Sequence, residues 1–239
     1  MQDLLEFAVN AHGGINQWHK FKGIRLEASI GGLVFDMKGQ QGIFQKVVIE
    51  LDNKAPHVTY TPFSKSGHSG MFSPEYVAHK NGNMIVQERS SPRESFNDLN
   101  QESRWDLLHA LYFGGYAIWN YLTAPFLFTY PGFQVSEGDV WKEGSDIWRR
   151  LHVTFPKGIP THCSEQTFYF DNAGLLRRLD YHVEILNAKT PVAHYLLDHK
   201  EVNGIVIPHR RKAVPMMESG HSMDGPVFVE INLEKASLL

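Results

Sequence analysis

The chain has 239 residues, 42% of them hydrophobic, and its 23 lysines and arginines are nearly balanced by 26 acidic residues, for a net charge of −3. No basic tract interrupts this balance, so the composition argues against nucleic acid as a partner. The one cysteine, Cys163, excludes an internal disulfide and indicates a reducing compartment. The first residues lack the pattern of a signal peptide, and we therefore predict a cytoplasmic protein.

The N-terminal part of the chain predicts two helices and then a series of antiparallel strands. Helical spacing of apolar residues covers 2–21, with a Gly-Gly pair as the stop between two short helices. Apolar and polar residues alternate over 24–30 and 43–51, which is the period of a strand with one buried face. The apolar segment 33–39 between them is predicted to continue the meander as a strand. Shorter strand signals, punctuated by Pro, Gly and Asn, follow at 57–61, 67–72, 75–80 and 83–88.

The strongest helix signal in the sequence lies at 105–122 and follows a polar, loop-like segment, 90–104. Its aromatic and aliphatic residues recur at steps of three and four and leave it apolar nearly all round, which is typical of a helix buried inside a protein. We predict a plug helix over about 103–123. The Gly114-Gly115 pair in its middle is expected to weaken or kink it. Because polar residues, glycines and a proline interrupt the apolar run, no integral membrane segment is expected.

The second half of the chain predicts a meander of strands that each have one apolar face. Two aromatic-rich strands flank the D-N-A-G turn at 171–174, and two more flank Asn203-Gly204, which is a strong hairpin signal. Over 178–185 an apolar face alternates with a charged one. The charged face, which is expected to be the solvated outside, carries Asp180, His182 and Glu184.

One long antiparallel sheet with a single buried face has to curl or to pack on a second layer. The plug helix is the obvious filling, because it is apolar nearly all round. The sequence therefore predicts a mainly β (α+β) fold, in which one curved antiparallel sheet of about ten or eleven strands forms an incomplete barrel around the helix at 105–122. In the absence of a linker or tandem repeat, residues 1–239 are predicted to form a single domain.

Two segments carry a resemblance to a known family. They are FYFDNAGLLRRLDY, at 168–181, and DHKEVNGIVIPHRRK, at 198–212. In each, a strand leads through a turn that contains glycine into the next strand, and over about 140–235 the chain resembles the LolA/LolB-like superfamily of bacterial lipoprotein-carrier half-barrels. The resemblance implies a hydrophobic cavity between the curved sheet and the plug helix, which that superfamily uses to hold acyl chains.

Candidate site residues follow from this architecture, because small-molecule sites are mostly apolar with a few polar groups. The candidates for ligand binding are Trp105, Tyr112, Tyr116, Trp119, Gln166, Phe168 and Tyr181. If the protein is an enzyme, His109 and His162 are the candidates for a general acid or base. The histidines show no metal-ligand spacing, so we expect no metal and no cofactor.

Two functions fit these features. The first is binding of a hydrophobic small molecule in the cavity between the sheet and the plug helix. The alternative is a cofactor-independent enzyme (a lyase, isomerase, cyclase or hydrolase) that uses a cavity histidine on a hydrophobic substrate. The fold alone hosts either activity, and the sequence leaves the identity of the ligand and the oligomeric state open.

Overall fold

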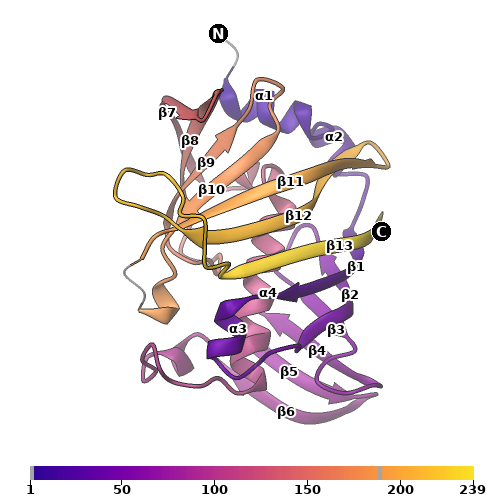
Figure 1. The fold of residues 1–239 in the computed structure, drawn as a ribbon. Coiled ribbons are helices and arrows are strands. Elements are labelled where there is room, and N and C mark those ends of the chain that lie inside the picture. The colour runs from indigo at the N-terminus through magenta and orange to yellow at the C-terminus, as the bar shows by residue number, and fades with distance from the viewer. Residues whose placement is uncertain (1–2, 188–189) are drawn as a thin grey trace.

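A single antiparallel sheet curls around one helix in the computed structural model, which describes residues 3–187 and 190–239 (Figure 1). The strands follow one another across the sheet in the order β6-β5-β4-β3-β2-β1-β13-β12-β11-β10-β9-β8-β7. The first six are β1 (Gly23–Gly31), β2 (Phe44–Asp52), β3 (Val58–Thr61), β4 (His68–Ser73), β5 (Tyr76–Asn81) and β6 (Met84–Ser90). The other seven are β7 (Gln134–Glu143), β8 (Asp146–Thr154), β9 (Glu165–Phe170), β10 (Leu176–Tyr181), β11 (Val192–Val202), β12 (Ile205–Pro215) and β13 (Val229–Leu238).

The first and last strands of the chain pair in the middle of this sheet. β1 pairs with β13 along most of its length, and Figure 1 shows them side by side. From there each half of the sheet runs outward as a meander to an edge strand, β6 or β7. The predicted mainly β, incomplete barrel around a central helix is confirmed. Over the described residues the sheet has thirteen strands rather than ten or eleven, and the short segments predicted at 57–61, 67–72, 75–80 and 83–88 each form a separate strand.

Helices fill the inside of the sheet and cover parts of its ends. They are α1 (Leu4–Ala11), α2 (Ile15–Trp18), α3 (Leu33–Met37) and α4 (Leu107–Thr123), with 3-10 turns η1 (Glu94–Phe96), η2 (Phe126–Thr129) and η3 (Glu184–Leu186). α1 and α2 lie within the predicted range 2–21, and the Asp3 side chain caps α1 by accepting a hydrogen bond from the backbone N–H of Glu6. α4 is the plug helix that was predicted over about 103–123.

The segment 33–39 does not form the predicted strand. Gly32 has a φ of 118°, a conformation that residues with side chains rarely adopt, and β1 ends just before it. The next two backbone N–H groups donate to carbonyls that lie just before β13, and the short helix α3 begins there. A short apolar run has no period that separates a strand from a helical turn, so the pattern alone could not decide between them.

α4 is buried from Leu108 to Thr123 and packs mainly on β3, β4 and β5. The helix continues through Gly114 and Gly115, which were expected to weaken or kink it. These glycines are the points at which aromatic rings of the sheet approach the helix backbone, Phe44 at Gly114 and Phe72 at Gly115. A glycine pair therefore brings the plug helix into contact with the sheet.

Gly115→Ala should destabilise the protein by about 1–3 kcal/mol, because the added methyl group would overlap with the Phe72 ring. Helix propensity alone predicts the opposite sign, a gain of about 1 kcal/mol. Urea unfolding measures the difference. Gly158→Ala is the control, since no atom lies within 4 Å of its Cβ position, and it should stay within about 0.5 kcal/mol of the parent. A Gly115→Ala variant as stable as the parent would contradict this packing.

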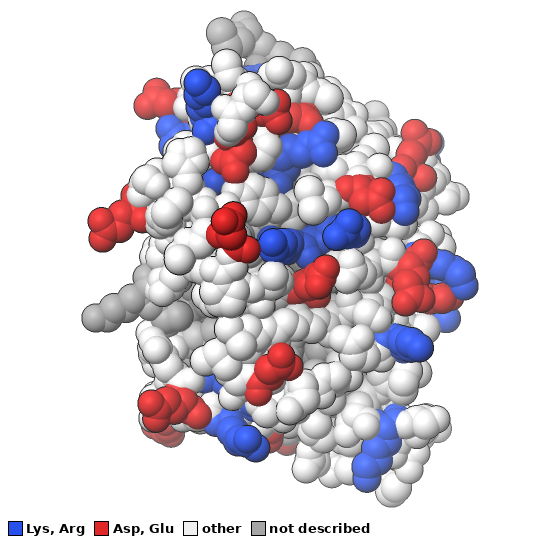
Figure 2. Space-filling model, in the orientation of Figure 1, with Lys and Arg blue, Asp and Glu red and all other residues white. Residues whose placement is uncertain are grey.

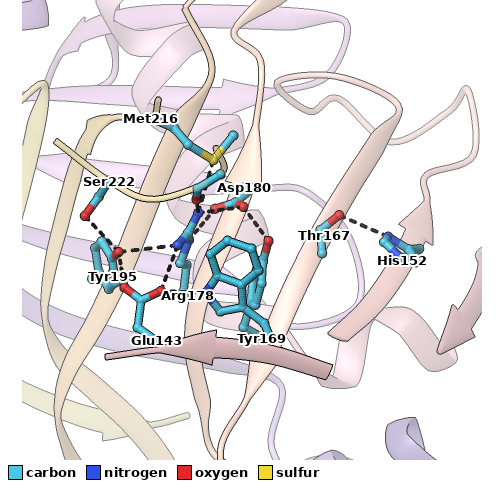
Figure 3. Close-up of polar contacts among 11 residues, drawn as sticks. Glu143, His152, Thr167, Tyr169, Arg178, Asp180, Tyr195, Met216 and Ser222 are labelled. Carbon is cyan, nitrogen blue, oxygen red and sulfur yellow. Dashed lines mark hydrogen bonds and ion pairs between the residues drawn. The ribbon is translucent and has the colours of Figure 1, made fainter. Parts of the chain in front are cut away.

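On the outer face of the sheet, a buried polar cluster around Arg178 fastens the loop that follows β12 (Figure 3). The Arg178 guanidinium donates to both carboxylate oxygens of Asp180, at 2.6 and 2.9 Å, and to Glu143 at 3.1 Å. It also donates to the backbone carbonyl of Gly220 in the loop. Three aromatic rings surround it at 4.9 to 5.5 Å, those of Trp141, Tyr169 and Tyr195.

The charged face of β10 is therefore not the solvated surface that the alternation predicted. Asp180 points outward but is only 9% exposed, and the Arg178 side chain is completely buried, because the loop after β12 covers both. Burial raises the pKa of Asp180, although Arg178 opposes the shift. His182 is exposed as expected, and Glu184 lies on η3, where it pairs with Arg93 at 3.1 Å.

Candidate functional site

An apolar pocket of about 200 Å³ lies between α3, α4 and the second half of the sheet. Its apolar lining comes from α3, α4 and the strands β11 to β13 with their connections: Val34, Met37, Phe113, Val183, Leu186, Val192, Ala213, Phe228 and Val229. Five polar residues complete the wall, namely His162, Tyr181, Lys38, Gln101 and Thr190, and the first three of these are buried. A mostly apolar pocket with a few fixed polar groups is the usual composition of a small-molecule site.

The polar part of this wall belongs to a chain of hydrogen bonds, which we call the tyrosine–histidine chain. The hydroxyls of Tyr116 and Tyr121, both on α4, contact the two ring nitrogens of His162, at 2.8 Å to Nδ1 and 2.6 Å to Nε2. The Tyr121 hydroxyl also contacts that of Tyr181 at 2.9 Å, and Tyr181 reaches Nδ1 of His194 at 3.2 Å. The rings of His162 and Tyr181 stack at 4.3 Å. The tyrosine–histidine chain joins the plug helix to β10 and β11.

All the titratable groups of the tyrosine–histidine chain are neutral at physiological pH. Burial, helped by Arg93, lowers the pKa of His162 to about 3. Burial also holds the pKa of His194 well below its ordinary value and raises the pKa of Tyr116 and Tyr181 well above theirs. An imidazole that stays uncharged has one N–H donor and one acceptor nitrogen, so His162 accepts from one tyrosine and donates to the other.

The Lys38 side chain anchors the loop at residues 100–103, which lies beside the pocket. The Lys38 ammonium donates to the carbonyls of Gln101 and Ser103, and it lies 3.4 Å from the carbonyl of Asn100. Lys38 and Gln101 both border the pocket. Burial lowers the pKa of Lys38. The loop is also tied to the opposite side of the pocket, where the Gln101 side chain donates to the carbonyl of Asn187 at 3.1 Å.

Five of the nine candidate site residues lie at or next to this pocket. His162 and Tyr181 line it, and Tyr116 supports it through its hydrogen bond to His162. Gln166 and Phe168 line a second, much smaller chamber of about 10 Å³, which shares His162 with the pocket. As ligand contacts or catalytic groups these residues remain predictions.

The other four candidates lie outside the wall of the pocket. Trp119 is fully buried and its indole N–H donates to the backbone carbonyl of Asp52 at 2.7 Å, so it packs the core. Trp105 packs behind Phe113, with the ring centroids 5.0 Å apart. Tyr112 borders a separate polar cleft.

His109, a candidate for a general acid or base if the protein is an enzyme, caps a helix in the structure and does not border the pocket. The side chain of Asp106 accepts from the backbone N–H of His109 at 2.9 Å, and the backbone N–H of Asp106 lies 3.2 Å from Nδ1 of His109. This reciprocal pair is a capping box at the N-terminus of α4. The Nε2 atom lies 3.3 Å from the carbonyl of Ser95, so both ring nitrogens are engaged away from the pocket.

Sequence reasoning missed three polar residues of the interior: Tyr121, His194 and Arg211. Arg211 lies on the same face of β12 as the buried Ile205 and Ile207, so strict alternation could have placed it inside.

Three further observations bear on the type of site. On the face seen in Figure 2, acidic and basic side chains are interspersed and no single-sign patch forms. Across residues 3–187 and 190–239, no three or more His, Cys, Asp or Glu side chains gather closely enough to hold a metal ion. None of the helices described combines the length and apolar composition needed to cross a bilayer.

Comparison with known proteins identifies the fold. No family model matches the chain, and no curated protein matches its sequence. A LolA superfamily protein from Nitrosomonas europaea superposes with a TM-score of 0.54 at 10% identity, over 99% of this chain and 92% of that one. A DUF1329 family protein from Desulfovibrio piger gives 0.55 at 11% identity, over 98% and 91%. At this identity the likeness shows the fold alone, and the chain has the LolA-like fold that its sequence pattern implied.

Proposed function

We propose that the protein binds a hydrophobic small molecule in the apolar pocket between the curved sheet and α4. The observation that carries this proposal is the composition of the pocket wall, which is apolar except for His162, Tyr181 and three polar residues that include Lys38. Ligand sites usually have volumes of about 300–1,000 Å³. A pocket of about 200 Å³ therefore favours a slim ligand, such as a single alkyl chain, over a bulky one.

Burial of an alkyl chain supplies the binding energy in this proposal. Each methylene group moved from water into an apolar site contributes roughly 0.8 kcal/mol before the costs of association are met. The LolA-like fold supports the proposal by analogy. The cytoplasm stays our prediction for the location, since the one cysteine, Cys163, is a buried free thiol.

Native mass spectrometry of the purified protein tests the proposal directly. We expect an extra mass of a few hundred daltons that is lost on denaturation and extracts into organic solvent. The second arm is titration with the neutral dye Nile red, which reports an empty site. A protein that is empty in the first experiment and does not bind the dye in the second contradicts the proposal.

Val34→Trp should lower the affinity for Nile red at least about tenfold, because an indole at this half-buried position on α3 would fill the pocket. Fluorescence titration measures the affinity. Val140→Trp is the matched control, since Val140 is 64% exposed on β7 and does not border the pocket. Equal affinities of the two variants would place the dye elsewhere.

Catalysis is the second candidate function and rests on the tyrosine–histidine chain, which borders the pocket. Both nitrogens of His162 contact tyrosine hydroxyls, so this residue can move a proton only if a neighbouring hydroxyl takes part. His162→Gln separates the two functions. A binding protein should keep most of its affinity for the molecule recovered by mass spectrometry, whereas an enzyme should keep binding and stop converting that molecule.

A further inference from the structure

Arg211 is a buried cation without a carboxylate partner. Its side chain points from β12 into the interior and is 2% exposed. One nitrogen, Nη2, donates to the backbone carbonyl of Tyr121, whereas Nε and Nη1 have no partner. In the part of the chain that the structure describes, the one buried carboxylate is that of Asp180, which pairs with Arg178 on the opposite face of the sheet.

Burying a guanidinium in this way is costly unless its charge is compensated. Some compensation is present: Tyr121 lies in the last turn of α4, whose carbonyl end is negative, and the guanidinium lies 5.3 Å from the Tyr121 ring. Burial lowers the pKa of Arg211 to about 10, so the group is still positively charged at pH 7. Two of its nitrogens still need acceptors.

The tyrosine–histidine chain ends in another unpartnered nitrogen beside Arg211. In one ordering Tyr116 donates to His162, His162 to Tyr121, Tyr121 to Tyr181, and Tyr181 to Nδ1 of His194. This ordering puts the hydrogen of His194 on Nε2, whereas the reverse ordering leaves the hydroxyl hydrogen of Tyr116 without an acceptor, so each leaves one hydrogen unpaired. In both orderings Nε2 of His194 has no partner.

His194 and Arg211 are close neighbours on the inner face of the sheet. His194 pairs with Ala213, two residues from Arg211 on β12, and Arg211 pairs with Leu196 on β11. On adjacent strands such diagonal neighbours are within reach of a common ligand. The positive charge of Arg211 also helps to lower the pKa of His194. Two unpartnered guanidinium nitrogens of Arg211 and the unpartnered Nε2 of His194 therefore lie in one region with one positive charge, and no buried carboxylate of the described residues pairs with them.

We propose that the ligand is an anionic amphiphile, such as a long-chain carboxylate, whose head group pairs with Arg211 and His194 while its chain occupies the apolar pocket. This inference rests on the proposed function and names the ligand class. Ala213 borders the pocket and lies on the same strand face as Arg211, about 7 Å away along β12. His162 borders both the pocket and the small chamber beside Arg211, so in this proposal the head group reaches Arg211 only when the His162 ring moves aside.

Hydration of the arginine by a water molecule in the small chamber is the competing explanation. Its volume of about 10 Å³ has room for about one water molecule. A water molecule satisfies one nitrogen and brings no negative charge, whereas a carboxylate accepts two hydrogen bonds from a guanidinium and neutralises it. The two cases differ in whether the protein prefers a charged head group.

Competition between palmitate and 1-hexadecanol, which have the same chain length, tests this preference. Each probe is titrated against protein-bound Nile red at pH 7.5, at concentrations below those at which palmitate forms micelles. We expect palmitate to bind the parent protein at least about tenfold more tightly, the effect of a charge-assisted hydrogen-bonded pair. Arg211→Met should bind the two probes equally. Arg210→Met, an exposed neighbour that points outward, should keep the preference.

The possible results separate the anionic ligand from the proposed function. Equal affinity of the parent for the two probes, or a preference that survives in Arg211→Met, overturns the anionic ligand but leaves the proposed function standing. If neither probe displaces bound Nile red, the anionic amphiphile is overturned, and the proposed function fails as well only if the protein is empty in mass spectrometry and does not bind the dye. If Arg211→Met does not fold, as judged by near-UV circular dichroism, the comparison of the two probes on the parent protein decides alone. Arg211→Lys keeps the charge without the planar fork, and it should retain a reduced preference for palmitate.

Discussion

Between pH 7.5 and pH 5 the free energy of unfolding should fall by about 8 kcal/mol because of four histidines with lowered pKa values. Burial lowers the pKa of His162 to about 3 and those of His12 and His199 to about 4, and it holds the pKa of His194 well below its ordinary value of 6.5. In the unfolded chain these groups bind protons below pH 6.5, whereas in the folded protein they stay neutral. The unfolded state therefore binds more protons, and stability is lost as the pH falls from 6.5 toward 4.

Urea unfolding followed by tryptophan fluorescence at stepped pH measures this loss. Domains of this kind have about 5–15 kcal/mol of stability, so we expect acid unfolding to be advanced by pH 5. His162→Gln should reduce the slope by about a quarter, since one of the four groups is removed. The control is His57→Gln, because His57 is exposed on the surface. A stability that does not change between pH 7.5 and 5 would mean that the interior histidines accept protons in the folded state.

Arg178→Met should destabilise the protein by about 3–5 kcal/mol, because it leaves the buried Asp180 and the partly buried Glu143 without their cation. The loop after β12 should also be freed, since Arg178 holds the Gly220 carbonyl. Urea unfolding measures the first effect, and faster proteolysis between residues 216 and 222 reports the second. The adjacent Arg177→Met serves as the control, because its ion pair with Asp171 is one-third exposed on the arginine side and should contribute less than about 1 kcal/mol.

A double variant separates loss of charge from loss of packing. Arg178→Met with Asp180→Leu removes both members of the pair, and replacement of a buried ion pair by apolar groups is often close to neutral. We therefore expect the double variant to be more stable than Arg178→Met alone. If the two are equally destabilised, the arginine acts mainly through its contacts with the three aromatic rings around it.

The fold could be read from the sequence wherever a repeating period was present. Alternation in β1 correctly placed Ile24, Leu26 and Ala28 inside, and the nearly continuous apolar surface of α4 indicated a helix surrounded by protein. The segment that became α3 was too short to show a period. Burial of Arg178 could not be predicted either, because the loop that covers it is distant in sequence and β10 alone cannot show what lies on top of it.

The candidate site was only partly predictable, for a related reason. Tyr181 and His162 could be proposed from strand patterns, since each belongs to a face with aromatic neighbours. The tyrosine–histidine chain, however, joins two residues of α4 to residues of β10, β11 and the segment before β9. These hydrogen bonds form only because folding brings the elements close together, and no pattern within a short segment of sequence shows those distances. His109 was a candidate because it lies on a helix that is apolar nearly all round, and the sequence pattern did not show that its ring caps the start of that helix.

Because β1 pairs with β13, the middle of the sheet can form only after β13 has been synthesised. Glu27 on β1 forms an ion pair with Lys235 on β13, 208 positions later in the chain. While the ribosome is still making the second half, β1 presents an unpaired edge, and such edges invite association with other chains. Contacts this distant also slow folding. The nascent protein therefore depends on protection of this edge until its last strand has emerged.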